Sequence, residues 1–161
     1  AIALTWGDID LVGRILTVRD PKNRNMHTLP IGQYLHHVLT ARRQRYAPTK
    51  NNKPVFDVVE PKKLIQKLAA ESGVAFSMHD LRRSFSTFAE GLNVPHYSLK
   101  RLLNHRVKDV TGGYVQIDVE RLREPMQQIE DFVLKSAGVR FRAVEQKSVK
   151  SRPPKNIQKL V

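Results

Sequence analysis

The chain has 161 residues, 40% of them hydrophobic, and no apolar run approaches the ~18 residues of a membrane span, which agrees with one globular domain that has its own core. Cysteine is absent, so disulfide bonds and thiolate zinc sites are excluded and we expect a reducing, cytoplasmic setting. Lys and Arg number 28 against 15 Asp and Glu, a formal net charge of +13, and this excess favours a polyanionic partner such as nucleic acid.

The first thirty residues predict a small antiparallel sheet, because β-rich segments alternate there with the turn signals "LVGR" and "DPKN". The predicted strands are Leu4–Asp8, Arg14–Arg19 and Met26–Pro30. Apolar residues at helical spacing then predict five helices, which are Gln33–Arg45, Lys62–Ser72, Met78–Leu92, Pro95–Asn104 and Val119–Ser136. Residues 1–137 are therefore expected to form one α+β domain, mostly helical with a three-stranded antiparallel sheet near its N-terminus. Residues 138–161 are basic and are expected to form a flexible tail.

The predicted helix Met78–Leu92 has one cationic face and one apolar face on a helical wheel. The cationic face carries His79, Arg82 and Arg83. The apolar face carries Leu81, Phe85 and Phe88. Two guanidinium groups beside an imidazole suit a cluster of anionic oxygens, since the guanidinium fork matches the geometry of a phosphate. A solvated polar face explains this helix, taken alone, about as well.

His105 and Tyr114 follow in "LLNHRVKDVTGGY". A single histidine at a helix C-terminus is most often a partner of the helix dipole, and a tyrosine after two glycines is often buried beside a tight turn. A phenol with a pKa of about 10 is a poor nucleophile unless cations lower that pKa and stabilise charge on the group it attacks. His, Arg and Tyr together therefore favour attack on a phosphodiester. The other histidines are interpreted as surface residues, and no metal site is expected from them; they are His27, His36, His37 and His96.

The order of "HDLRRSF", "LLNHR" and a tyrosine nine residues after His105 resembles the catalytic domain of the tyrosine recombinases, the phage integrase family. The likeness is tightest with P4-type prophage integrases, in "LTWGDID", "RDPKNR", "HTLPI", "VTGGY" and "VERLREPMQQI", and runs from Leu4 to about Leu134. It implies a DNA breaking-rejoining fold and a site-specific recombinase. Such an enzyme acts on double-stranded DNA attachment sites of a mobile element, here in the bacterial cytoplasm and on the nucleoid.

The resemblance implies a role for each matching residue. Tyr114 would attack the scissile phosphate, leaving a 3′-phosphotyrosyl link and a free 5′-hydroxyl, while Arg82 would hold the non-bridging oxygens. His79 would hydrogen-bond the phosphate and assist proton transfer, His105 would add a further donor, and Lys22 would protonate the departing 5′-oxygen. Because the tyrosyl ester conserves the energy of the phosphodiester, no metal and no other cofactor is expected. Contacts to the DNA backbone are expected from Arg83, Lys100, Arg101, Arg106 and Lys108.

The resemblance also implies that the chain lacks one catalytic segment of the family and that the whole protein has partners. Another catalytic arginine of the family precedes the segment equivalent to "AIALTW", so we expect an N-terminally truncated catalytic domain that is monomeric and inactive alone. Recombination in the family requires a synapse of four protomers, so the whole protein is expected to form a homotetramer. The predicted helix Val119–Ser136 either contacts a neighbouring protomer or closes its own core.

Three other functions compete with a recombinase. A type IB topoisomerase shares the nucleophile and the fold of the family. A non-catalytic DNA-binding or architectural protein with a recombinase-like fold would lose nothing when Tyr114 is changed to Phe, whereas an enzyme would lose its covalent adduct. A ribosome-associated basic protein would prefer RNA and gives no role to the arrangement of His79, Arg82 and Tyr114.

Overall fold

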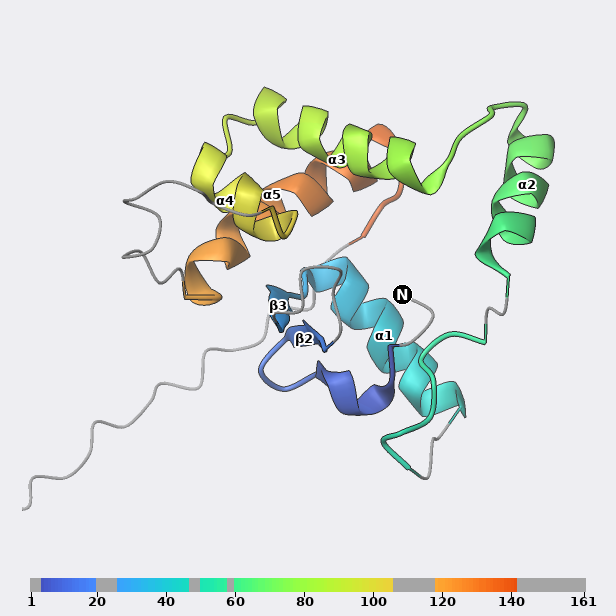
Figure 1. The fold of residues 1–161 in the computed structure, drawn as a ribbon, viewed down its shortest axis with the longest axis vertical. Coiled ribbons are helices and arrows are strands. Elements are labelled where there is room, and N and C mark those ends of the chain that lie inside the picture. Colours follow the sequence, from blue (N-terminus) through green and yellow to red (C-terminus); the bar gives the residue numbers. More distant parts are fainter. Residues whose placement is uncertain (1–3, 20–25, 47–49, 58–59, 106–117, 142–161) are drawn as a thin grey trace, which may run out of the picture.

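The computed structural model describes residues 4–19, 26–46, 50–57, 60–105 and 118–141, which form an α+β fold (Figure 1). In chain order the elements are η1 (Trp6–Asp8), β1 (Ile9–Asp10), β2 (Ile15–Val18), β3 (His27–Pro30), α1 (Gln33–Tyr46), α2 (Pro61–Ser72), α3 (Met78–Gly91), α4 (His96–Leu102) and α5 (Glu120–Ser136). The strands form an antiparallel sheet in the order β1-β2-β3. The predicted fold class and the antiparallel meander are confirmed. No helix within the described ranges is long and apolar enough to cross a membrane.

The first predicted strand, Leu4–Asp8, is wrong: a 3-10 turn, η1, occupies most of it. The carboxylate of Asp8 accepts hydrogen bonds from the backbone N–H of Thr5 at 2.8 Å and from its hydroxyl at 2.7 Å. These local bonds compete successfully with strand pairing, which begins only at Ile9. Burial opposes ionisation of Asp8, but the hydrogen bonds from Thr5 and Arg19 outweigh it and hold the pKa of Asp8 below its usual value.

The register of the sheet fixes the base of the hairpin between β2 and β3. Ile15 pairs with Pro30, and at the other end Val18 pairs with His27. The loop of this hairpin contains Lys22, which lies outside the described residues. His27 is therefore the first residue of β3, where the chain returns from that loop.

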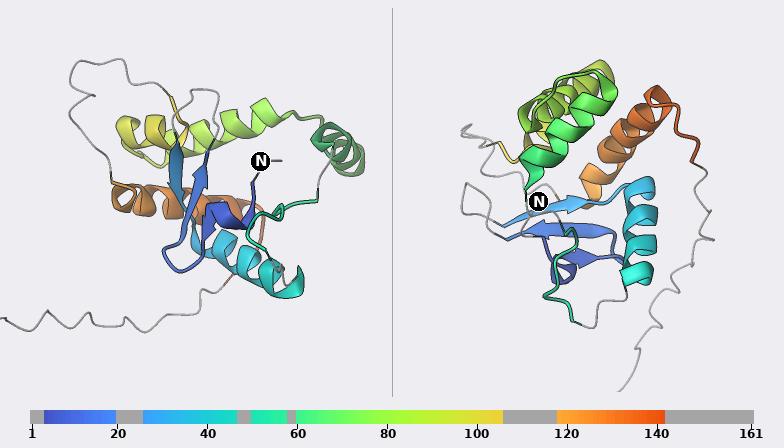
Figure 2. Two further views of the ribbon diagram at one scale, coloured as in Figure 1. Left: turned by 60° about the horizontal axis from the view of Figure 1, so that its bottom comes forward. Right: turned by 90° about the vertical axis from the view of Figure 1, so that its right-hand side faces the viewer.

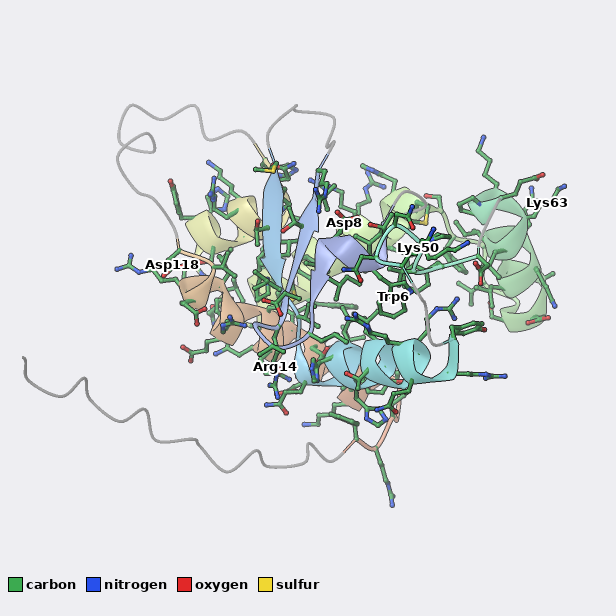
Figure 3. All side chains as sticks on the ribbon, turned by 90° about the horizontal axis from the view of Figure 1, so that it is seen from below. Trp6, Asp8, Arg14, Lys50, Lys63 and Asp118 are labelled. Atoms are coloured by element: carbon green, nitrogen blue, oxygen red, sulfur yellow. The ribbon has the colours of Figure 1, made fainter. Side chains whose placement is uncertain are left out.

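Two apolar clusters form the core. The first lies between the sheet and α1 and consists of Trp6, Ile9, Ile31, Leu39 and Val55. The second joins α3, α4 and α5 and consists of Ala89, Val94, Leu99, Leu102, Leu103, Leu122 and Ile129, with Leu29 of β3 against it. Figure 2 accordingly shows α3, α4 and α5 together on one side of the sheet and α1 along another. Figure 3 shows Trp6 between η1 and α1.

The buried face of α3 begins one turn later than the helical wheel predicts. Leu81 is 51% exposed, whereas Phe85 packs against the second cluster. The cause is the position of α5, which covers the C-terminal half of α3: the rings of Phe88 and Phe132 lie 5.1 Å apart between centroids. Leu122 and Ile129 of α5 are almost completely buried in this chain's own core. In the described structure, α5 therefore takes the second of the two roles expected for it.

The N-terminus of α1 is capped by α5. The carboxylate of Glu130 accepts hydrogen bonds from the backbone N–H groups of Tyr34 at 2.8 Å and Leu35 at 3.0 Å. The side-chain oxygen of Gln127 accepts one from the N–H of Gln33 at 3.0 Å. Because the first four N–H groups of a helix have no partner within the helix, these two side chains satisfy donors that α1 cannot satisfy itself.

Helix α2 has no buried residue and stands apart from the other helices (Figure 1). Its apolar side chains Leu64 and Leu68, which predicted an amphipathic helix, are 45% and 43% exposed.

Candidate active site

Helix α3 begins with a capping box that sets the position of His79. The Ser77 hydroxyl accepts a hydrogen bond from the Asp80 N–H at 3.3 Å, and the Asp80 carboxylate accepts bonds from the Ser77 N–H at 3.0 Å and hydroxyl at 2.6 Å. These bonds from Ser77, helped by the charges of Arg83 and His79, lower the pKa of Asp80. Because the cap fixes Met78 as the first helical residue, His79 lies exposed in the first turn.

Arg82 lies one turn further along α3 and reaches the end of α4. Its Nη2 donates a hydrogen bond to the backbone carbonyl of Leu103 at 2.5 Å. Since a guanidinium has five N–H donors in a planar fork, this bond orients the group and leaves donors for an anion. The neighbouring Arg83 instead forms a 4.0 Å ion pair with Asp80, and its side chain is 74% exposed. Solvent-exposed pairs of this kind add little stability, so Arg83 remains available to a charged partner.

Helix α4 ends in a Schellman motif that sets the position of His105. Asn104 adopts a left-handed conformation with φ of 54°, and its N–H donates to the Arg101 carbonyl at 3.0 Å. The N–H of His105 donates to the Lys100 carbonyl at 2.9 Å. These are the two hydrogen bonds that define the motif, and asparagine is the usual alternative to glycine at its left-handed position. The sequence analysis missed Asn104, although an asparagine directly after the last apolar residues of a helix is a signal for this ending.

His27 is not the surface residue that the sequence analysis predicts. Its Nε2 atom is buried and has no hydrogen-bond partner among the described residues. Burial lowers the pKa of His27, and the positive charges of Arg101 and Arg82 lower it further, against the opposing effect of the Leu102 backbone. The burial of His27 could not be predicted from "MHTLPI", because the alternation within a four-residue strand does not show which other element packs against the end of that strand.

His36 is also misassigned as a surface residue. Its Nε2 lies 3.0 Å from the Leu11 carbonyl, in a partly buried contact between α1 and the turn after β1. His37 and His96 are exposed, as predicted.

The structure thus brings residues from three elements to the end of α4. Arg82 comes from α3, His27 from β3, and His105 from the turn after α4. His79 lies one turn before Arg82 on the same helix, and Lys100 and Arg101 occupy the last turn of α4. Four predicted site residues lie outside the described residues; they are Lys22, Arg106, Lys108 and Tyr114.

The described part of this group is cationic and suits an oxyanion. Arg82 and Arg101 both oppose a positive charge on His27 and so lower its pKa. In the described ranges no three His, Asp or Glu side chains converge as metal ligands. A guanidinium oriented by a fixed backbone carbonyl, beside histidines and further cations, can bind the non-bridging oxygens of a phosphate and stabilise charge that develops there.

Comparison with known proteins identifies the family to which this chain is similar. Residues 1–121 match the family described as the phage integrase family. The chain is 24% identical over 147 residues to the prophage integrase IntF of Escherichia coli strain K12, covering 85% of this chain and 31% of the relative. It is 25% identical over 133 residues to the tyrosine recombinase XerA of Thermococcus kodakarensis, covering 74% of this chain and 46% of the relative.

The chain spans less than half the length of either relative. A comparison with solved structures found no match. Because the family match extends over far more than half of the 161 residues and includes α3, α4 and the motifs that hold Arg82 and His105, the chain belongs to the phage integrase family.

Proposed function

We propose that this chain is the catalytic domain of a site-specific DNA recombinase that integrates and excises a mobile element. The observation that carries the proposal is the hydrogen bond from Arg82 to the Leu103 carbonyl, two residues before His105. It joins the two motifs, "HDLRR" and "LLNH", that bear the proposed phosphate ligands. Membership of the phage integrase family and the printed names of the two relatives support the same function.

The proposed reaction is a transesterification at one DNA phosphate. The phenolic oxygen of Tyr114 attacks phosphorus, the bond to the 5′-oxygen breaks, and a 3′-phosphotyrosyl link forms. The tyrosine proton passes to His79, and Lys22 gives a proton to the departing 5′-oxygen. Attack of a 5′-hydroxyl on the phosphotyrosyl link reverses these steps and reseals the strand. No cofactor is required, since one ester is exchanged for another.

Arg82 and His105 are proposed to stabilise the charge on the two non-bridging oxygens. Donors placed where charge develops in the transition state contribute on the order of 10²–10³ in rate each. The bond to Leu103 holds the Arg82 group in place before DNA arrives, so little reorganisation is needed during the reaction.

The remaining cations of the site are proposed to hold the DNA backbone. The proposed phosphate contacts are Arg83, Lys100, Arg101, Arg106 and Lys108. Such contacts set the register of a duplex without reading its sequence, and they make binding weaker as salt rises. Since the chain spans 31% and 46% of its two relatives, we propose that the 161 residues alone bind DNA weakly as a monomer. Recombination would belong to a tetramer of the whole protein.

The test is a covalent-trapping experiment. The chain, with any residues that precede Ala1 in its gene, is mixed with a nicked duplex that carries the element's attachment core. We expect a covalent protein–DNA band on a denaturing gel that disappears in Tyr114→Phe. Tyr46→Phe is the matched control, because Tyr46 is 52% exposed and its ring lies under the guanidinium groups of Arg42 and Arg45 of α1.

The outcome separates an enzyme from a binding protein. A band that persists in Tyr114→Phe would show that another residue is the nucleophile. DNA binding without any band, on the core and on its genomic flanking sequence, would indicate a non-catalytic DNA-binding protein with a recombinase-like fold.

A further inference from the structure

The end of β2 is tied to η1 by the side chain of Arg19, which directly follows the last strand residue, Val18. The Nε of Arg19 donates a hydrogen bond to the Asp8 carboxylate, and its Nη2 donates to the backbone carbonyl of Gly7 at 3.1 Å. Because a guanidinium is planar, two bonds to neighbouring acceptors fix its orientation. The chain that leaves β2 is therefore anchored to a segment outside the sheet.

Asp8 is a rigid partner for Arg19. It lies in η1 (Figure 3), and its side chain is only 7% exposed. Its other oxygen, Oδ2, accepts hydrogen bonds from the Thr5 N–H at 2.8 Å and from the Thr5 hydroxyl at 2.7 Å. Burial opposes ionisation, but these bonds and the one from Arg19 hold the pKa of Asp8 below its usual value, so the carboxylate is charged at neutral pH. Removing one partner of so buried a charge costs more than breaking an exposed ion pair.

The loop that follows Arg19 carries Lys22, the proposed general acid. The described pairing between β2 and β3 ends at Val18 and His27. Lys22 lies outside the described residues, but it is only three positions from Arg19 in the sequence. Since three residues of extended chain span at most about 11 Å, the anchored position of Arg19 limits where the backbone of Lys22 can lie.

We propose that Asp8 and Arg19 are positioning residues for Lys22. They hold the end of β2 against η1, and through it they keep the ammonium group within reach of the departing 5′-oxygen. A general acid must lie within hydrogen-bonding distance of the atom that it protonates, so even a small shift of the loop would slow proton transfer. The inference rests on the recombinase function proposed above, and it adds two residues to the five that are proposed to act on the phosphate.

Asp10 provides a matched control at the other end of β2. Its Oδ1 accepts hydrogen bonds from two backbone N–H groups of the turn between β1 and β2, at 2.9 Å each. β2 begins after that turn and ends before Arg19. Asp8→Asn and Asp10→Asn therefore make the same chemical change at opposite ends of one strand, and only the first lies beside the end that leads to Lys22.

The experiment uses a duplex in which sulfur replaces the bridging 5′-oxygen of the scissile phosphate. A thiol is a far stronger acid than an alcohol, so the thiolate departs without a proton from Lys22. Arg19→Gln is the main variant, because the Arg19 side chain is 68% exposed and its loss leaves the core intact, whereas Asp8→Asn changes a buried group. Lys22→Ala shows the full effect of losing the general acid.

The two substrates separate loss of the general acid from damage to any other step. On the normal duplex, we expect Arg19→Gln and Asp8→Asn to slow single-turnover adduct formation about 10- to 100-fold, the scale of a small misplacement of a reacting group, with little change in the Kd for DNA. On the sulfur-bridged duplex, both variants and Lys22→Ala should react at close to the wild-type rate. Asp10→Asn should match the wild type on both. Equally large slowing of Arg19→Gln on the two duplexes, or a wild-type rate for it on the normal one, would overturn the proposal.

A double substitution shows whether Arg19 acts through Lys22. In a chain that already carries Lys22→Ala, Arg19→Gln is expected to cause no further slowing on the normal duplex, because no ammonium is left to position. A further loss as large as in the wild-type background would contradict the proposal. If Lys22→Ala itself has the wild-type rate, Lys22 is not the general acid and the inference fails, whereas the covalent band still supports a recombinase.

Amide hydrogen exchange tests the anchoring without any cleavage. Arg19→Gln is expected to speed exchange in the segments that contain Val18 and His27, and Asp10→Asn is expected to leave it near the wild-type rate there. Unchanged exchange in Arg19→Gln would overturn the inference, whatever the chain does to DNA. If the wild type forms no adduct, the recombinase proposal and the role of Lys22 fail together, while faster exchange would still show that Arg19 anchors β2.

Discussion

The guanidinium of Arg82 donates a hydrogen bond to the backbone carbonyl of Leu103, 2.5 Å away, and so ties α3 to the end of α4. The C-terminus of a helix carries a partial negative charge, which favours a cation at this place. Both partners of this bond belong to the protein, so the fold itself orients Arg82. His105 follows two residues later, and both proposed phosphate ligands therefore depend on the same helix end.

Replacing Arg82 by lysine is expected to slow adduct formation about 10²- to 10³-fold, because an ammonium keeps the charge but lacks the planar fork that can bond a carbonyl and a phosphate together. Single-turnover trapping on the nicked duplex measures the effect. Arg121→Lys is the matched control, since Arg121 is exposed on α5 and is not among the proposed contacts to DNA, and a small change in rate is expected for it. A wild-type rate in Arg82→Lys would contradict the assigned role.

Asn104→Ala is expected to lower the free energy of unfolding by about 1 kcal/mol, because alanine tolerates a φ of 54° less well than asparagine does. Asn104→Gly should lose less unfolding free energy than Asn104→Ala, since glycine adopts this φ without strain. Asn93 offers a control, since it has a φ of 56° and forms the same ending on α3. Urea unfolding should show similar losses for both alanine variants, whereas adduct formation should fall only for Asn104→Ala. Equal adduct rates in the two variants would show that the end of α4 does not set the site.

The lowered pKa of His27 predicts a dependence of stability on pH. The unfolded chain takes up a proton near pH 6.5, while the folded chain takes it up only at lower pH, so the unfolded state binds more protons between these two values. The wild type should therefore be fully stabilised above pH 6.5 and lose stability as the pH falls through the folded pKa of His27. His27→Asn has no imidazole at this position, so it should lack the loss of stability that protonation of His27 causes. Parallel unfolding curves for the two proteins between pH 7 and pH 5 would contradict the prediction.

Glu130→Ala is expected to cost about 1–2 kcal/mol of unfolding free energy, since it removes the acceptor of two N–H groups at the start of α1. Glu124→Ala is the control, because Glu124 is an exposed residue of the same helix. Gly32→Ala should be destabilising for a related reason: its Cβ would overlap the Glu130 carboxylate. Thermal unfolding measures all three, and a loss for Glu124→Ala as large as that for Glu130→Ala would show that capping is not the cause.

The sequence predicted those features that repeat within a short segment. The alternation before Pro30 and the helical spacing from Gln33 to Ser136 gave the sheet and the helices to within a few residues. The turn at Trp6–Asp8 was missed because two hydrogen bonds between Thr5 and Asp8 outweigh the preference of the segment for a strand. Burial of His27 was missed because it depends on a helix end 75 positions later in the chain.

In the candidate site, too, the features that depend on local sequence were predicted and those that depend on packing between elements were not. The spacing of His79 and Arg82 on one helix follows from local periodicity, so the sequence places both on one face. The contact between Arg82 and Leu103 depends on how α3 and α4 pack, which no local pattern specifies. Lys22 and Tyr114 lie outside the described residues, and their roles stay predictions.

The capping of α1 by Glu130 has a consequence for the order in which the protein folds. The two bonded residues, Tyr34 and Glu130, are separated by 96 positions, so the first turn of α1 lacks its partners until α5 has been made and has docked. Contacts between such distant parts of a chain close slowly, because a long loop must be ordered first. On the ribosome, a nascent chain that ends before α5 would expose both the unfinished start of α1 and the apolar residues of α3 and α4 that Leu122 and Ile129 cover in the folded domain. We therefore expect release of α5 from the exit tunnel to be the step that commits this domain to its native state.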